Sequence, residues 1–468
     1  MPVIAILLLG TGIYMTVILR FMPILKIPAA FALLWKGRKA EKGEEGQITP
    51  FAALMTALSS TVGTGNLAGV ATAITLGGPG AIFWMWMTAL VGMATKYTES
   101  MLAVRYREVD EDGNFKGGPM YYIKNGLGPK WKWLAVVFSL GAIASAVTAG
   151  NMVQSNGIAE VANSSFNVPN WATGLILAGL AFVVIIGGIK SIGRFASKLV
   201  PIMAFGYIAA AIIVLGLNAD GIPTAMKLIF SDALNGQAAV GGFSGAVVAL
   251  AIRAGIARGL FSNEAGQGSA PIAHAAAKTK DPVQQGTIAM LGTFIDTIVI
   301  CTMTALVILT VKGEFVGVDA NGIEHAVDYV WQSNLEGARI TSAAFEAGIP
   351  GGSYIITLAL MVFAFTTILG WSYYGERSIS FLIGEKAVLP FRFIWCVFTF
   401  GGALLTVQSV WKLGDIGNAV MAAPNLIAII LLSGVVVSMT RGGEYHRKIH
   451  PHDESAHAKG LHNVDGET

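Results

Sequence analysis

The sequence predicts an all-α, polytopic membrane protein with about eleven transmembrane helices, two of which are broken. Hydrophobic residues make up 54% of the 468 positions and charged residues only 13%, whereas soluble domains carry about 25% charged residues. Apolar runs long enough to cross a bilayer recur along the whole chain. Two of these runs are interrupted by clusters of glycine and small polar residues.

The apolar runs define eleven candidate spans when each is required to hold about 20 predominantly apolar residues. The first run begins at Val3 without a basic segment before it or a small-residue cleavage site after it, so we expect a retained span. The connections 104–133, 218–242 and 312–350 are long enough to hold an interfacial helix each. The spans are 3–22, 50–76, 81–103, 134–155, 171–189, 199–217, 243–277, 284–311, 351–375, 389–410 and 412–438.

The distribution of Lys and Arg predicts the orientation of the chain. Most of its 31 basic residues lie in alternate loops and in the tail that begins at Arg441. Basic loops remain in the cytoplasm, so we expect a cell (inner) membrane protein with its N-terminus outside and its C-terminus inside. Cys301 and Cys396 both lie in apolar spans, which predicts neither a disulfide nor a redox role.

The stretch Ser59–Gly69, SSTVGTGNLAG, predicts the first helix break. Glycine costs roughly 1 kcal/mol relative to alanine inside a helix, and Gly63, Gly65 and Gly69 fall within seven residues. A break exposes backbone N–H and C=O groups, which a membrane tolerates only where they face protein or a polar cavity. The hydroxyl and amide side chains around the glycines are suited to such a cavity.

The stretch Ala257–Pro271, ARGLFSNEAGQGSAP, predicts a second break in a span of opposite direction. Glycine could serve helix packing alone, but the polar side chains in both clusters favour broken helices. Two broken spans at matching positions are typical of inverted-repeat secondary transporters. We therefore expect repeats at 50–217 and 243–438. The remaining parts are an N-terminal span with a cytoplasmic linker (1–49), an extracellular connection (218–242) and a cytoplasmic tail (439–468).

Three segments resemble the alanine/glycine:cation symporter family, the sodium:alanine symporters. They are GGPGAIFWMWMTALVG (77–92), TVGTGNLAGVATAI (61–74) and GLFSNEAGQGSAPIAHAAA (259–277). The resemblance extends from Gly10 to about Arg441, and Gln267 stands where the family motif has an apolar residue such as leucine. It implies a five-plus-five inverted-repeat fold and Na⁺-coupled symport of alanine or glycine into the cell by alternating access. No cofactor besides the co-transported ion and no nucleic acid partner are expected.

A zwitterionic substrate needs partners for both of its charges. We expect backbone N–H groups near Gly65 and Asn66, where the first broken span restarts, to face the carboxylate. Free carbonyls near Phe261, where the second broken span stops, would face the ammonium group. The candidate substrate-binding residues are Ser60, Thr64, Gly65, Asn66, Gln154, Phe261, Ser262, Asn263 and Trp371.

The adjacent hydroxyls of Thr366 and Thr367 predict a Na⁺ site, because hard cations prefer oxygen ligands. In the inverted-repeat fold their span passes beside the first break, where Thr61 and Gly63 would complete the coordination. Both threonines could instead bond back to the preceding helical turn. Trp371, on the same face as Thr367, could close the pocket or serve packing.

Ionisable residues inside spans are either functional or paired for structural reasons. Glu264 could pair with Arg258, and Asp296 with Arg253. Proton coupling is the alternative to Na⁺ coupling, and Glu264, Asp296 and His274 are the proton candidates. An intramembrane enzyme is disfavoured because the sequence has no HExxH, GxSxG or Walker A motif. An ion channel would need a pore ring.

Overall fold

The computed structural model describes residues 2–39, 43–111, 113–234, 244–318 and 322–449. In this part the chain is mostly helical, as predicted. The α-helices up to residue 234 are α1 (Pro2–Ile18), α2 (Met22–Leu25), α3 (Ile27–Lys36), α4 (Pro50–Thr61), α5 (Val70–Gly77), α6 (Ala81–Arg105), α7 (Pro119–Gly126), α8 (Lys132–Ser145), α9 (Val153–Phe166), α10 (Asn170–Ile185), α11 (Gly188–Leu217) and α12 (Ile222–Leu234).

The second half repeats the pattern of long helices joined by short connections. Its α-helices are α13 (Ser244–Asn263), α14 (Ala270–His274), α15 (Pro282–Thr293), α16 (Thr302–Thr310), α17 (Ala338–Gly348), α18 (Gly352–Ile383), α19 (Val388–Leu404), α20 (Val407–Leu431) and α21 (Ser433–Ile449). Three π-helical segments lie between α-helices: η1 (Gly65–Gly69), η3 (Ala146–Met152) and η5 (Phe294–Cys301). The predicted cytoplasmic tail lies outside the described residues beyond Ile449.

Two antiparallel hairpins correct the all-α prediction. Strands β1 (Glu108–Val109) and β2 (Phe115–Lys116) pair in the connection 104–133, and β3 (Lys312–Val318) pairs with β4 (Glu324–Tyr329) in the connection 312–350. Each of the three long connections also holds a helix: α7, α12 and α17. The hairpins escaped prediction because short strands carry a weak hydrophobic signal beside long apolar helices.

Among the described residues, five continuous helical segments are long and apolar enough to cross a membrane. A sixth is obtained if the bent pair Ile416–Leu431 and Ser433–Gly442 counts as one span. The number eleven therefore remains a prediction. Several predicted spans are broken, as at residue 62, or correspond to shorter apolar helices such as Asn170–Ile185. The five segments are Pro129–Phe166, Gly188–Leu217, Pro282–Thr310, Gly352–Ile383 and Glu385–Leu404.

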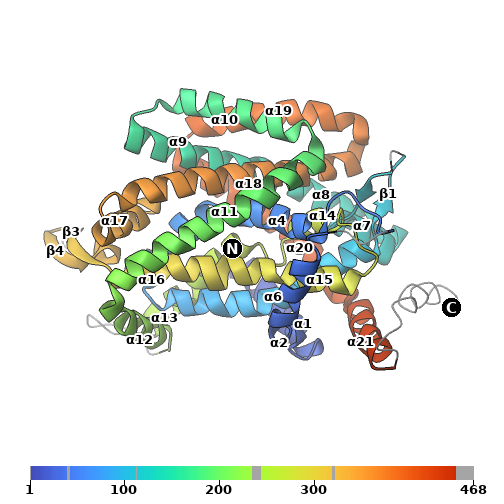
Figure 1. Cartoon of the computed structure of the whole chain (residues 1–468), viewed down its shortest axis with the longest axis horizontal. Helices are drawn as coiled ribbons and strands as arrows, with labels where there is room; N and C mark the ends of the chain where they lie inside the picture. The colour runs from blue at the N-terminus through green and yellow to red at the C-terminus, as the bar shows by residue number, and fades with distance from the viewer. Residues whose placement is uncertain (1, 40–42, 112, 235–243, 319–321, 450–468) are drawn as a thin grey trace.

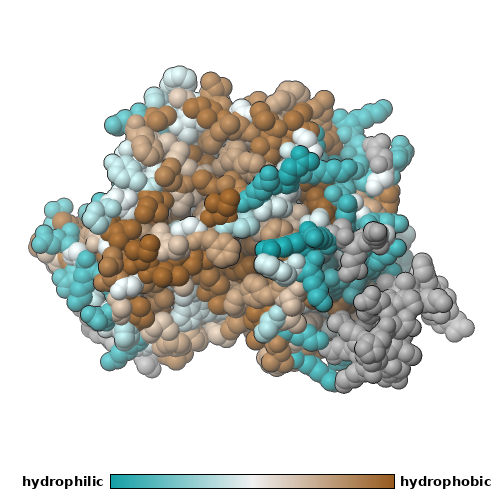
Figure 2. All heavy atoms as spheres, viewed as in Figure 1, coloured by the Kyte–Doolittle hydropathy of each residue, from teal (hydrophilic) through white to brown (hydrophobic). Residues whose placement is uncertain are grey.

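The long helices run side by side along the longest axis of the molecule (Figure 1). The β3–β4 hairpin, α12 and α17 lie at one end, whereas β1, α7 and α21 lie at the other. Brown apolar side chains cover the middle of the visible face, and teal side chains collect towards the two ends (Figure 2). This pattern suits a protein whose middle lies in lipid.

Local sequence signals explain where the central helices begin. The Thr49 side chain accepts a hydrogen bond from the backbone N–H of Ala52 (3.1 Å) at the start of α4, and Pro50 occupies the first turn. Asp281 caps α15 through the N–H groups of Val283 and Gln284. A side-chain acceptor at the N-cap satisfies a backbone donor that the helix itself leaves free.

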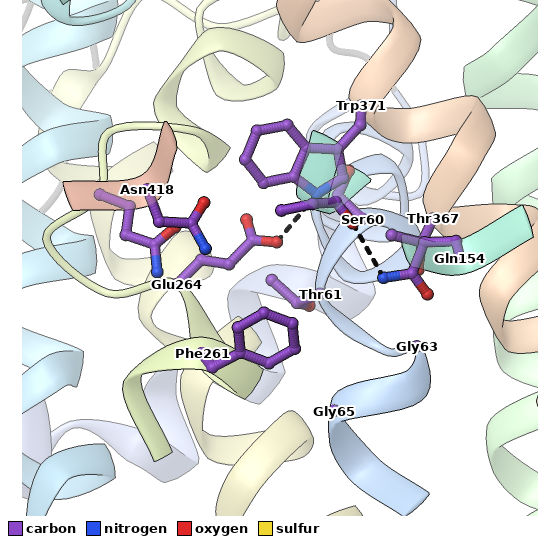
Figure 3. Close-up of a pocket in the computed structure, with 12 residues that line it drawn as sticks. Ser60, Thr61, Gly63, Gly65, Gln154, Phe261, Glu264, Thr367, Trp371 and Asn418 are labelled. Atoms are coloured by element: carbon purple, nitrogen blue, oxygen red, sulfur yellow. Dashed lines mark hydrogen bonds between the residues drawn. The ribbon is translucent and has the colours of Figure 1, made fainter. Parts of the chain in front are cut away.

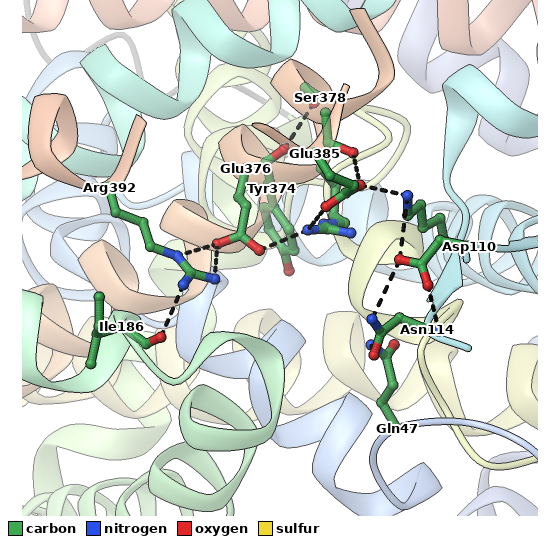
Figure 4. A network of polar contacts seen from close by, with 12 residues as sticks. Gln47, Asp110, Asn114, Ile186, Tyr374, Glu376, Ser378, Glu385 and Arg392 are labelled. Atoms are coloured by element: carbon green, nitrogen blue, oxygen red, sulfur yellow. Dashed lines mark hydrogen bonds and ion pairs between the residues drawn. The ribbon is translucent and has the colours of Figure 1, made fainter. Parts of the chain in front are cut away.

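A network of ion pairs joins β2, α18, Glu385 and α19 at the end of the molecule where β1 and α7 lie (Figure 4). The buried Glu376 of α18 receives Arg377 at 2.9 Å and Arg392 of α19 at 2.6 Å. Glu385 links Arg377 to Lys116 of β2, at 3.3 and 2.5 Å. The network therefore ties the β1–β2 hairpin to α18 and α19.

The same network extends into the hairpin through Asp110, which lies 3.3 Å from Lys116. Burial opposes ionisation of this carboxyl group, but the backbone N–H of Asn114 and the charge of Lys116 hold its pKa below the usual range. Asp110 therefore carries its negative charge at neutral pH and completes the link between the hairpin and the helices.

Candidate functional site

The first predicted break is present between α4 and η1. Helix α4 ends at Thr61, Val62 is extended (φ −75°, ψ 98°), and the chain resumes helical geometry at Thr64. The Asn66 side chain accepts a hydrogen bond from the N–H of Gly63 (2.9 Å). Thr341 of α17 donates to the carbonyl of Leu67 (3.1 Å). The groups that the break frees are thus satisfied by nearby polar side chains.

The second predicted break follows α13. Helix α13 ends at Asn263, and a turn leads to α14 at Ala270. Within the turn Gly266 and Gly268 have φ values of 84° and 85°, which glycine adopts without strain. Glu264 also has a positive φ of 55°. A non-glycine residue held in this region stores strain, and such residues cluster at functional sites.

Asp296 of η5 connects the two breaks. Asn66 of the first break donates to its Oδ1 at 2.7 Å, and Ser262, at the end of α13, donates to its Oδ2 at 2.8 Å. Thr297 also donates to Oδ2 at 2.8 Å. All of these groups are buried. These hydrogen bonds occupy three of the about four acceptor positions of a carboxylate.

A small cavity lies between the two breaks (Figure 3). Its volume of about 20 Å³ exceeds the ~10–15 Å³ that one water molecule needs on this measure. Both breaks, η3, α9, α18 and α20 contribute to its wall. The lining residues are Ser60, Thr61, Gly63, Gly65, Ala149, Gln154, Phe261, Glu264, Gln267, Thr367, Trp371 and Asn418.

Glu264 supplies the carboxylate of this cavity. Trp371 of α18 donates its indole N–H to Oε1 at 3.0 Å, and Ser269 donates to Oε2 at 2.5 Å. Figure 3 shows the Glu264 side chain pointing towards Trp371, with Phe261 and Thr61 nearby. The indole ring also packs against Gly150, where an added Cβ would come within 2.2 Å of it. Trp371 is therefore held in a fixed position as one wall.

Eight of the predicted site residues line this one cavity. They come from four separate helices and the first break, so the structure brings together positions up to about 310 residues apart. Thr367 also donates to the carbonyl of Val62 (3.3 Å), which places it beside the first break as expected. The eight are Ser60, Thr61, Gly63, Gly65, Gln154, Phe261, Thr367 and Trp371.

The other predicted site residues do not line this cavity. Asn66 and Ser262 direct their side chains to Asp296, and Asn263 donates to Thr297 at 3.2 Å. Thr64 lies on the far side of the first break, in a second cavity. The side chains of Asn66, Ser262 and Asn263 therefore organise the breaks, and their role in substrate binding stays a prediction.

The structure separates the hydroxyls of Thr366 and Thr367, which were predicted to lie together at the ion site. Its Oγ1 donates to the carbonyl of Phe363 (2.8 Å) and lies 3.7 Å from the Met203 sulfur of α11. Successive residues on a helix point about 100° apart, so Thr366 faces away when Thr367 faces the cavity. Thr367 also bonds back to Phe363 (3.1 Å) while it contacts Val62. Both alternatives considered for these threonines are thus present in the structure.

The structural pairings proposed for the ionisable residues are wrong. Glu264 bonds to Trp371 and Ser269, while Arg258 lines the second cavity. Asp296 bonds to the two breaks, while Arg253 is exposed. Charge complementarity along the sequence did not reveal which helix faces these side chains point to.

Four lining residues were not among the predicted site residues: Ala149, Glu264, Gln267 and Asn418. The sequence could have indicated Glu264 and Gln267 as site residues, since both lie in the second glycine cluster. The sequence contained no signal for Ala149 or Asn418, because these residues reach the cavity only through the packing of η3 on α18 and of α20 on η3.

The fold and the cavity together define a class of protein. A helical membrane protein with two broken helices around a central polar cavity is a secondary transporter. Solved structures show the same fold. MhsT in complex with L-phenylalanine has a TM-score of 0.57 at 15% identity, covering 83% of this chain and 90% of that chain. The Eremococcus coleocola manganese transporter, bound to an aromatic bis-isothiourea substituted compound, has a TM-score of 0.52 at 10% identity, covering 84% and 78%.

The chain belongs to the Sodium:alanine symporter family, which it matches over residues 1–459. It is 48% identical to the sodium/alanine symporter AgcS of Methanococcus maripaludis, over 96% of this chain and 95% of that protein. It is 37% identical to the probable sodium/glutamine symporter GlnT of Bacillus subtilis, over 92% and 85%. The protein is thus a multi-pass membrane transporter and not an enzyme.

We predict that Asn66 and Asp296 stabilise the fold as a coupled pair. Hydrogen bonds to charged groups contribute about 1.5–3 kcal/mol, so Asn66→Ala and Asp296→Ala should each lower the free energy of unfolding. The double variant should lose less than the sum of the two by a similar amount. The measurement is denaturant unfolding of the purified protein in detergent micelles.

The matched control combines Asn66→Ala with Asn163→Ala, an exposed residue of α9 that bonds to Val168. The effects of these two changes on the free energy of unfolding should add. Simple additivity of the Asn66 and Asp296 changes would contradict the bridge between the breaks.

Proposed function

We propose that the protein is a Na⁺-coupled symporter that carries alanine or glycine into the cell by alternating access. The observation that carries the proposal is the polar cavity between two helix breaks, with a carboxylate and a threonine hydroxyl in its wall. Membership of the Sodium:alanine symporter family and the likeness to AgcS support the choice of substrate and ion.

The two breaks polarise the cavity in the way that a zwitterion requires. The chain restarts as a helix at Thr64–Gly65, and a helix N-terminus attracts negative charge. Helix α13 ends at Asn263, and a helix C-terminus attracts positive charge. The substrate carboxylate would therefore lie towards Gly65, and its ammonium group towards Phe261 and Glu264.

Glu264 is the residue to which we assign the substrate ammonium. Its carboxylate lines the cavity beside the C-terminal end of α13, so two sources of negative potential coincide there. The hydrogen bonds from Trp371 and Ser269 fix its orientation and leave further lone pairs available. Because Trp371 is also fixed against Gly150, a substrate side chain larger than methyl would meet a rigid wall.

The Na⁺ ion would lie beside Thr367. Its hydroxyl and the carbonyl of Val62 are 3.3 Å apart at the first break, next to Gly63 and Thr61. An added Cβ at Gly63 would come within 2.7 Å of the Thr367 hydroxyl, so glycine permits this close approach. Hydroxyl and carbonyl oxygens are the ligands that hard cations prefer.

The orientation and the repeat boundaries belong to the same proposal. We infer an N-terminus outside and a C-terminus inside, since the basic loops predict this arrangement. The repeats would be 50–217 and 243–438, with the breaks at equivalent positions in each. The end of the molecule that carries α17 and the β3–β4 hairpin would then be extracellular, and the end with the Glu376 ion-pair network cytoplasmic.

Uptake by proteoliposomes tests the function. An inward Na⁺ gradient should drive accumulation of labelled alanine, and excess unlabelled glycine should compete with it. A proton gradient imposed without Na⁺ should drive none. Accumulation that follows the proton gradient equally well would instead support proton coupling, and the absence of any amino-acid accumulation by the folded protein would refute the proposal.

Thr367 and Thr366 provide a paired test of the ion site. Thr367→Val keeps the shape of the side chain but removes a cavity oxygen, so the Na⁺ concentration for half-maximal alanine uptake should rise about tenfold or more. Thr366→Val is the control, because that hydroxyl faces Met203 of α11, and its Na⁺ dependence should be nearly unchanged. Equal effects of the two changes would place the ion elsewhere.

Glu264→Gln tests the ammonium contact. Replacing the charge with a neutral amide should weaken alanine binding by about ten- to a hundredfold, the range for a hydrogen bond to a charged group. Glu376→Gln is the matched control, since it neutralises another buried glutamate that pairs with arginines and does not line the cavity. Direct binding of labelled alanine to the purified variants is the measurement. Unchanged affinity in folded Glu264→Gln would remove Glu264 from the substrate site.

A further inference from the structure

A second and much larger cavity lies at the end of the molecule where α17 lies. Its volume is about 470 Å³, against about 20 Å³ for the cavity between the breaks. Ligand pockets typically measure about 300–1,000 Å³, so this cavity is large enough for a whole amino acid with a bulky side chain. Helices α5, α9, α13, α17 and α18 all contribute to its wall.

The charges in this cavity are of both signs. Arg258 of α13 and Arg339 of α17 line it together with Glu160 of α9 and Glu336. Arg258 is half-buried, whereas the other three are exposed. A guanidinium group binds a carboxylate through two parallel hydrogen bonds, and a glutamate can accept from an ammonium group. The cavity therefore offers partners for both charged groups of a free amino acid.

The remaining wall is mostly apolar, with hydroxyl groups at intervals. Val153, Val161, Ile356 and Leu360 contribute side chains to it. Apolar walls with a few convergent polar groups characterise sites that bind amphipathic small molecules. This surface suits an amino acid with a branched or aromatic side chain better than it suits alanine.

Thr64 lies between the two cavities. It lines the larger one, while its neighbours Gly63 and Gly65 line the smaller one. Its hydroxyl is buried (the residue is 3% exposed) and has no hydrogen-bond partner among the described residues. A buried hydroxyl without a partner is uncommon and calls for an explanation. The oxygen itself is closed off from the larger cavity, so a ligand there would reach it only after the Thr64 side chain rotates.

We propose that this larger cavity, defined by Thr64, Arg258, Arg339, Glu160 and Glu336, is a separate binding site for neutral amino acids. Those with side chains too large for the cavity between the breaks bind here without being transported, and they inhibit alanine uptake. Their carboxylate pairs with Arg258 or Arg339, and their ammonium group with Glu160 or Glu336. The inference rests on the proposed transport function only for the inhibition, since binding is independent of it.

Leucine is the probe, and two measurements separate this inference from the proposed function. Binding of labelled leucine to the purified protein tests the site directly. In proteoliposomes, leucine should inhibit Na⁺-driven alanine uptake without being accumulated, and excess alanine should not fully relieve the inhibition. If no alanine uptake is found, the proposed function fails, while leucine binding still tests the site.

Arg258→Gln should weaken leucine binding about tenfold or more, because it removes a charged partner of the carboxylate. Arg339 is an exposed residue of α17 that also lines the cavity, so Arg339→Gln tests the same site if Arg258→Gln fails to fold. Arg253→Gln is the matched control: Arg253 is an exposed arginine of the same helix that does not line the cavity, and its change should leave leucine binding unaltered.

Three results would overturn the proposal. One is the absence of leucine binding to protein that transports alanine. The second is leucine affinity that stays unchanged in folded Arg258→Gln and Arg339→Gln. The third is accumulation of leucine in the vesicles with inhibition that excess alanine fully relieves, since leucine would then occupy the cavity between the breaks.

Discussion

The hydrogen bonds that Asp296 accepts from the two broken helices are the interaction on which the rest of the site depends. A broken helix within the apolar middle of a protein exposes backbone groups, and each group left without a partner costs several kcal/mol. The side-chain oxygen of Asn66 accepts a hydrogen bond from the backbone N–H of Gly63, and its side-chain N–H donates to Asp296. Ser262 brings α13 to the same carboxylate. One buried acid thus fixes the distance between the two chain breaks that enclose the cavity.

Helix α18 forms the opposite side of the site, and glycine determines how closely it approaches. An added Cβ at Gly63 would collide with Thr367, and one at Gly150 would collide with Trp371. Because these neighbours pack directly on backbone, the wall cannot shift without moving whole helices. The glycines therefore have two effects: they weaken helices at the breaks, and they allow polar and aromatic groups of α18 to reach exposed backbone.

Buried charge surrounds the second break more densely than the first. Lys96 and Glu99 of α6 are almost completely buried (2% and 0% exposed), and Glu99 accepts hydrogen bonds from Gly268 and Asn425. Lys96 lies within electrostatic range of Glu99, Glu264 and Asp296. A charge in such surroundings is tolerable only near opposite charges or hydrogen-bonding groups. The turn at 264–268 is therefore held by hydrogen bonds from Gly268 to Glu99 and from Asn425 to the carbonyl of Gly266, which explains how a strained Glu264 is retained.

The sequence by itself determined the helical membrane class, both breaks, the family and most of the cavity. These features depend on composition and on local sequence. Glycine, as at 63 and 266, weakens a helix wherever it is placed, and long apolar runs are stable in the lipid bilayer. Tertiary structure decided which way each polar side chain points. Thr366 and Thr367 are adjacent in sequence, yet only Thr367 faces the first break, because the rotation of α18 against α4 and α11 selects its face. Likewise Glu264 points to Trp371 and not to Arg258, because its positive φ takes the chain out of the helix after Asn263, a geometry that charge and spacing do not encode.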